Sequence, residues 1–193
     1  MKIYSELELD ALRELANIGS GTAGTALSTL IGRPVDISVP SARAMDVEAA
    51  VDAAGDAARE VRATLVPITG ALEGSALIVF GPEDAATLCR MLDADPDGED
   101  GASALAEIGN ILCSSYLVAL GSMLDVDIDP RPPETAWDLL GAIVASVLLA
   151  QGEIGEVLIL DSELLVEAAS VGLEFMLLPV GHGIGGLLER LGV

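Results

Sequence analysis

Two groups of polar residues with one shared spacing stand far apart in this sequence. In chain order the groups are Asp10, Glu14 and Asn17, and then Ser103, Glu107 and Asn110. Each group stands at i, i+4 and i+7, which places its three side chains on one face of an α-helix. An amide can both donate to and accept from a water molecule, and a carboxylate one turn away can pair with a cation. The pattern therefore predicts a site that positions water beside a bound cation.

A proline follows each asparagine at the same distance along the chain. Pro40 and Pro133 each lie 23 residues beyond Asn17 and Asn110 respectively. A single Glu-x-x-Asn on a helix occurs often by chance and would be an ordinary solvated face. Two full copies with identical long spacings are specific, so we interpret them as functional.

The helix that must position the first group is predicted over 6–31. Its apolar residues recur at near-helical spacing, with Ser5 as a candidate cap. Gly32 and Pro34 then end the helix. A strand is expected over 35–39.

The remaining elements of the first half are shorter. A short helix within 46–58, strands over 61–68 and 75–80, and a helix over 83–92 are predicted, in that order. The polar, turn-rich residues 94–101 are the best linker in the chain.

After this linker the order of elements recurs. The second half is predicted to contain a helix over 102–123, a strand over 126–129, a helix over 134–150, strands over 157–168 and 171–179, and a helix over 184–191. An offset of 93 aligns Glu14 with Glu107 and Asp36 with Asp129; later the offset grows, because Glu60 best matches Glu156. We therefore expect two diverged copies of one unit, about 1–93 and 102–193, in a single domain of 193 residues.

The repeated pattern of an Asp or Ser, a Glu, an Asn and a distant Pro resembles the motif of the CheC, CheX and FliY phosphatases of chemotaxis. The resemblance covers essentially the whole chain. It implies an α/β, pseudo-twofold fold in which two intertwined repeats share one largely antiparallel sheet, with both motif helices on one face. It also implies that the chain is a hydrolase that removes phosphate from the response regulator CheY.

The resemblance assigns roles to the motif residues. Asn17 and Asn110 would each hold a water in line with the phosphorus of the regulator's aspartyl phosphate, while Glu14 and Glu107 would pair with the regulator's active-site lysine. The supporting residues are Asp10 and Ser103, which would cap the local network or contact the partner, and Pro40 and Pro133, which would shape the backbone. No cofactor or metal of its own is expected, since the Mg²⁺ belongs to the phosphorylated regulator.

Two complete motifs favour the CheC type within this family, and the resemblance to the family implies a second partner, the receptor deamidase CheD. The apolar helix predicted over 134–150 is either buried between the halves or a docking surface, and is the candidate for CheD. The alternative function is a non-catalytic adaptor that binds CheY, CheD or both. Because Ser103 stands where the first motif has Asp10, and Gly19 to Gly24 loosen the first helix, the two sites are expected to differ in activity.

Charge and composition exclude other partners. The formal net charge is −22 with nine Lys and Arg residues, and Lys2 is the only lysine, so the chain would repel nucleic acid. An acidic, lysine-poor surface resembles proteins of halophilic archaea, adapted to molar salt; an acidic docking face is the alternative. Cys89 and Cys113 lie in apolar runs and indicate buried, reduced thiols.

The N-terminal sequence lacks the apolar core of a signal peptide. No run of the sequence approaches the ~20 apolar residues that cross a bilayer. We therefore expect a cytoplasmic protein that is not inserted in a membrane.

Overall fold

The computed structural model describes residues 6–53, 56–152, 156–167 and 169–181, together with positions 186 and 189. It has the expected mixed α/β architecture, built on one sheet. The elements in chain order are α1 (Glu6–Ile31), β1 (Val35–Asp46), α2 (Val47–Ala53), β2 (Glu60–Gly70), β3 (Gly74–Phe80), α3 (Pro82–Met91), α4 (Glu99–Leu124), β4 (Ile128–Pro130), β5 (Glu134–Leu139), α5 (Leu140–Gln151), β6 (Glu156–Val166) and β7 (Ala169–Pro179).

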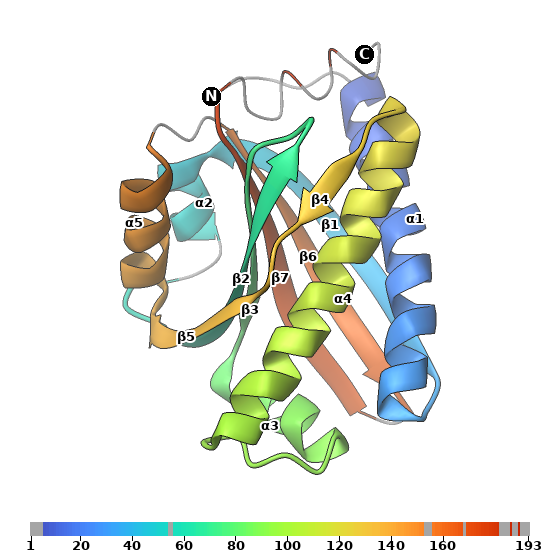
Figure 1. Cartoon of the computed structure of the whole chain (residues 1–193), viewed down its shortest axis with the longest axis vertical. Coiled ribbons are helices and arrows are strands. Elements are labelled where there is room, and N and C mark those ends of the chain that lie inside the picture. Colours follow the sequence, from blue (N-terminus) through green and yellow to red (C-terminus); the bar gives the residue numbers. More distant parts are fainter. Residues whose placement is uncertain are drawn as a thin grey trace.

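The sheet is antiparallel at every strand pair among the described residues. Its strand order is β1-β6-β7-β3-β2-β4, and β5 also pairs with β2. The long helices α1 and α4 lie side by side across one face, which we call the motif face, while α2 and α5 cover the opposite face (Figure 1). The three layers therefore enclose two apolar clusters, one on each side of the sheet.

The two halves of the chain are intertwined through the sheet. β1 pairs with β6 of the second half, β4 and β5 pair with β2 of the first half, and β3 and β7 meet in the centre. The strand registers of the two repeats are equivalent. Val35 opposes Val166, and Ile128 opposes Gly70. Ile128 is the counterpart of Val35 at the offset of 93, and Val166 is the counterpart of Gly70 at the offset of 96. The prediction of two intertwined repeats in one antiparallel sheet is confirmed.

The motif helices pack together through small residues and one aromatic ring. Gly19 of α1 lies under Tyr116 of α4, so close that an added Cβ would come within 2.2 Å of the ring. Tyr116 in turn packs against Phe175 of the sheet as a tilted ring pair, with 4.7 Å between ring centroids. Cys89 and Cys113 are buried and free, as expected.

Both motif helices end in the same way. α1 is followed by Gly32 at φ 72°, and α4 is followed by Asp125 at φ 54°, both in the left-handed region that ends helices. The two residues are again separated by 93 positions. The shared cap directs each chain into the strand that lies beside its own motif helix.

One predicted element is wrong in part. The helix expected over 134–150 is a strand, β5, over its first six residues, and only Leu140–Gln151 is helical. Residues 134–139 carry no helical period, and they pair with β2 at the edge of the sheet, a long-range contact that overrides local propensity. α5 buries Leu140, Ile143 and Val144, whereas Leu149 is 88% exposed, so this helix is both a core element and a surface.

The expectation that no segment is apolar enough to cross a membrane also needs correction. By length and composition α4 meets that criterion, but 67% of its apolar window is buried inside the fold. Its apolar residues pack against α1 and the sheet, so α4 is a core helix. The final predicted helix, over 184–191, falls almost wholly outside the described residues.

Candidate active site on the paired motif helices

α1 presents the first motif to solvent. Asp10, Glu14 and Asn17 are all exposed, while Leu12 and Leu15 on the other side of the helix are buried at 4% exposure. Asp10 accepts a hydrogen bond from the Arg13 guanidinium at 2.7 Å on the helix surface. The burial of the leucines orients this face of α1 outward.

α4 presents the second motif in the same way. Ser103 and Glu107 are exposed and Asn110 is half-buried, while Leu105, Ile108 and Leu112 are buried in the core, each at 3% exposure or less. Because α1 and α4 lie side by side on the motif face (Figure 1), both groups open to the same side of the molecule. The structure therefore brings each group together within its own helix.

The amides and carboxylates of both motifs are available for a ligand. Among the described residues, no donor or acceptor engages the side chains of Glu14, Asn17, Glu107 or Asn110. Asn17 and Asn110 are also the two asparagines of the whole chain, and they occupy equivalent positions. Such an arrangement can orient water and bind a cation. It holds no cluster of three potential metal ligands within the described part of the chain.

The prolines of the motif lie where the strands beside the helices are interrupted. The pairing of β1 with β6 shifts register between Ser38 and Ser41, across Pro40. Pro133 lies in the equivalent gap between β4 and β5, both of which pair with β2. Proline has no N–H to contribute to a ladder, so it is tolerated at such irregularities. The bend carries each strand past its motif helix.

A hollow beside α1 reaches the first asparagine. It has a volume of ≈ 260 Å³ and lies between α1 and the start of β1, with Asn17, Gly21, Gly24 and Asp36 among its lining residues. Gly24 allows this close approach, since an added Cβ would meet the Val35 carbonyl oxygen at 3.0 Å. Asn17 therefore stands at the rim of a concave surface.

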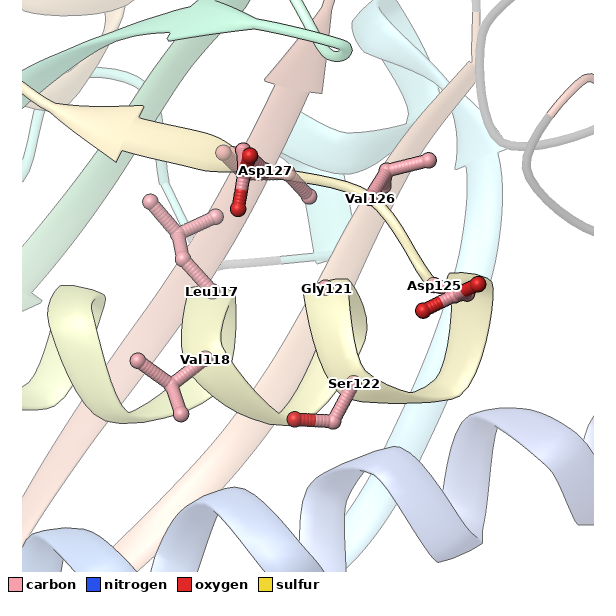
Figure 2. A pocket seen from close by; sticks show the side chains of 8 residues that line it. Leu117, Val118, Gly121, Ser122, Asp125, Val126 and Asp127 are labelled. Carbon is pink, nitrogen blue, oxygen red and sulfur yellow. The ribbon is translucent and has the colours of Figure 1, made fainter.

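The corresponding hollow beside α4 does not reach Asn110. It has a volume of ≈ 440 Å³ and lies at the end of the helix, lined by Val118, Ser122, Asp125 and Asp127 among others (Figure 2). Ser114 and Leu117 occupy the positions at which α1 has Gly21 and Gly24. α4 therefore lacks the two glycines that line the hollow beside Asn17, and Leu117 lines the hollow at the end of α4 instead.

The comparisons with known proteins agree with this geometry. The model of the CheC-like family matches residues 7–42 and 101–136, which contain all eight motif positions. The "CheY-P phosphatase CheC" of Bacillus subtilis is 35% identical over 159 residues, covering 78% of this chain and 76% of that protein.

The chain belongs to the CheC-like family.

Solved structures show the same fold in other members of this group. FliY of Thermotoga maritima superposes with a TM-score of 0.79 at 20% identity, covering 99% of this chain and 98% of that one. CheX in its complex with CheY, BeF₃ and Mg²⁺ from Borrelia burgdorferi superposes with a TM-score of 0.51 at 14% identity, covering 86% and 97%. The CheC-like architecture of two motif helices on a shared sheet thus confirms the resemblance seen in the sequence.

Sequence reasoning missed one residue of the CheC-like motif face. Trp137 of β5 is 55% exposed and lies against the Arg62 guanidinium, 3.5 Å from Cζ to the ring centroid. A helix prediction over 134–150 could not place this side chain, because its position depends on the pairing of β5 with β2. Regular alternation of polar and apolar residues would have been the signal, and residues 134–139 lack it.

Proposed function

We propose that this chain is a phosphatase that hydrolyses the aspartyl phosphate of a CheY-class response regulator at two sites, one on each motif helix. The observation that carries the proposal is the repeated Glu and Asn on equivalent exposed helix faces, whose side chains have no partner among the residues that the structure describes. The family membership supports it, because a relative that is 35% identical is named as a CheY-P phosphatase.

The residue types suit the reaction. An aspartyl phosphate is a mixed anhydride, so its hydrolysis needs an aligned water more than a strong base. In the proposed step the water oxygen bonds to phosphorus as the bond from phosphorus to the aspartyl oxygen breaks. The aspartate leaves as a carboxylate, and the two protons of the water remain on the released inorganic phosphate. The amides of Asn17 and Asn110 would each fix the attacking water and remove its orientational freedom. The Mg²⁺ would be held by the regulator, and this chain would supply no metal.

Glu14 and Glu107 would orient the regulator. Each lies one turn from its asparagine and is exposed without a cation partner among the described residues, so it can pair with the regulator's active-site lysine. A pair at the edge of an interface contributes orientation and specificity more than affinity. Asp10 and Ser103, one turn earlier, would contact the rim of the partner.

The decay of the phosphorylated regulator tests the assignment of the asparagines. In molar salt with Mg²⁺, wild-type protein should accelerate the decay, and the Asn17→Ala/Asn110→Ala double variant should lose on the order of a hundredfold of that acceleration. Circular dichroism would verify that the double variant is folded. Acceleration retained by a folded double variant would rule out the proposed mechanism.

The proposed role of the glutamates in binding is tested by KM and not by the decay rate alone. Glu14→Gln/Glu107→Gln should raise KM for the phosphorylated regulator by about tenfold, with a smaller effect on kcat, since a charge pair is lost. Glu48→Gln/Asp52→Asn on α2 removes two exposed carboxylates from the opposite side of the molecule and is the matched control. An equal effect of both changes would show that net charge, not these positions, governs binding.

CheD binding, which also bears on the adaptor alternative, is assigned to the face of the sheet opposite the motif helices. We propose that CheD docks on α5, because Leu149 of this helix is 88% exposed and other residues of α5 line a hollow of ≈ 370 Å³ together with β2, β3 and β5. Leu149→Asp should weaken CheD binding and leave phosphatase activity intact. A protein that binds CheY and CheD but never speeds phosphate release would instead be the adaptor.

A further inference from the structure

The motif face carries an exposed aromatic group on β5, a strand that packs against α4. Trp137 lies on β5 at the edge of the sheet, with 55% of its surface exposed. Large apolar side chains are costly to leave in water, and tryptophan is the residue type most enriched in the energetic centres of protein interfaces. The chain contains one tryptophan, which makes its placement informative.

The strand register places Trp137 on the same side as α4. Thr64 of β2 faces α4, because its hydroxyl donates to the Leu105 carbonyl at 3.0 Å. Arg62 is two residues away and so faces the same side, and Trp137 is its cross-strand partner. Cross-strand partners project from the same face of a sheet.

Arg62 also fixes the level of Trp137 along α4. Its guanidinium donates to Asp97 at 2.7 Å, and Asp97 lies just before α4 begins at Glu99. Trp137 is therefore level with the first turns of α4, where Ser103 and then Glu107 are presented on the same side. β5 also packs against α4, so the indole and the second motif lie on neighbouring elements of the motif face.

The indole is held in place before any partner binds. Arg62 covers one side of the ring at 3.5 Å and is itself only 15% exposed, clamped by Asp97. A cation held against the ring restricts its rotamers, and an anchor that is already ordered costs less entropy on binding. The remaining exposed surface of the indole is free for contact.

The first site lacks this group. At the equivalent register pair Ala44 opposes Leu158, so neither the aromatic ring nor the cation is present beside Asn17. Because the aromatic ring and the cation occur in only one of the two repeats, they are not a structural requirement of the repeat. They fit an anchor that serves one site. The two sites thus differ in this aromatic group as well as in the position of the hollow beside each motif helix.

We infer that Trp137, preorganised by Arg62, is the anchor that binds the response regulator at the Asn110 site and makes that site the tighter of the two. This inference rests on the proposed function, because it takes the occupant of the surface to be the regulator docked over Glu107 and Asn110. This occupant is supported by the packing of β5 against α4, the helix that carries the second motif, and by the Arg62–Asp97 hydrogen bond that places the indole beside the start of that helix. Trp137 contributes to binding and not to the chemical step.

Fluorine NMR can observe this contact directly. Protein labelled with 5-fluorotryptophan carries one resonance, from Trp137, and the Asn17→Ala variant leaves the second motif intact. Titration with a beryllofluoride-activated CheY-class regulator and Mg²⁺ should move this resonance saturably. An unmoved resonance, while fluorescently labelled regulator shows binding, would overturn the inference, as would an absence of any binding.

Kinetics separate the anchor from the proposed reaction. In the Asn17→Ala background, Trp137→Ala should raise KM about tenfold with kcat unchanged, and Trp137→Phe should restore most of the loss. In the Asn110→Ala background Trp137→Ala should have no effect. Leu165→Ala, which removes an exposed apolar side chain from the opposite face of the sheet, should have none in either background.

An equal effect of Trp137→Ala in both backgrounds would overturn the anchor. A resonance shift without any acceleration of decay would leave the anchor standing and refute the proposed hydrolysis. Accelerated decay without a resonance shift would refute the anchor and leave the proposed hydrolysis standing.

Discussion

At the scale of residues, the motif positions were predictable because their exposure follows from helical periodicity alone. The burial of Leu12 and Leu15 is enough to turn Asp10, Glu14 and Asn17 outward. Residues whose surroundings depend on strand pairing could not be foreseen. Trp137 is one such residue, and Glu174 is another.

Glu174 on β7 is half-buried and lies on the face of the sheet opposite the motif helices. Its burial raises the pKa of the carboxyl, an effect that the nearby Asp161 and Asp84 reinforce and that Arg59, at 3.1 Å, opposes. Arg43 also faces this group of charges, paired with Asp161 at 2.8 Å. The folded state thus binds the Glu174 proton more tightly than the unfolded chain does.

This raised pKa makes a signed prediction about stability. A carboxyl whose pKa is raised on folding stabilises the fold at low pH, and that contribution is lost as pH rises through the folded-state pKa. Glu174→Gln mimics the protonated form, so the variant should gain stability relative to wild type as pH rises above 4.5, the ordinary pKa of a glutamate, and through the raised folded-state pKa. Denaturant unfolding of both proteins in molar salt measures the difference. A difference that is flat with pH, or that favours wild type more as pH rises, would contradict the stated cause.

At the scale of elements, α1 was predicted at the bounds that the structure shows, Glu6–Ile31. Its period is regular, and Gly32 marks its end. β1 extends beyond the predicted 35–39 to Asp46, because the bulge at Pro40 interrupts the ladder without ending the strand. β5 was mistaken for helix for the reason that also hid Trp137: only its pairing with β2 makes it a strand.

Two glycines of α1 should respond oppositely to the same substitution. At Gly21 nothing lies within 4 Å of an added Cβ, so Gly21→Ala should stabilise the protein by about 0.5–1 kcal/mol through helix propensity. At Gly19 the Cβ would come 2.2 Å from the Tyr116 ring, so Gly19→Ala should destabilise by about 1–3 kcal/mol through overpacking. Guanidinium unfolding of the two variants gives both values. Equal effects would mean that α1 and α4 do not pack as closely as the structure shows.

At the scale of the whole molecule, the net charge of −22 is the dominant feature. The ion pairs among the described residues all use arginine, as in Arg33 with Glu167 on the surface, and most of the acidic residues have no such counterion. Composition predicts this repulsion without any knowledge of the fold, since it depends on charge number and size. Composition could not predict which acidic residues lie on α2 and in the loops, because that depends on the fold.

The thermal stability of the protein should therefore rise with salt. Raising KCl from ~0.1 M to ~1 M shortens the Debye length from ~10 Å to ~3 Å and screens the repulsion between carboxylates. The unfolding midpoint should increase across this range, and less steeply for Glu48→Gln/Asp52→Asn, which removes two exposed charges from α2. A midpoint that is flat or falls with KCl would show that the acidic surface is not an adaptation to salt.

The equivalence of the two halves leads to the most direct test of the whole account. It compares the decay of the phosphorylated regulator at subsaturating concentration with wild-type protein, Asn17→Ala, Asn110→Ala and the double variant. Two independent sites predict that each single variant keeps part of the acceleration, that the two parts add up to the wild-type value, and that the double variant returns to the spontaneous rate. If either single variant abolished the acceleration alone, or if the folded double variant retained it, the account of two repeated active sites would be wrong.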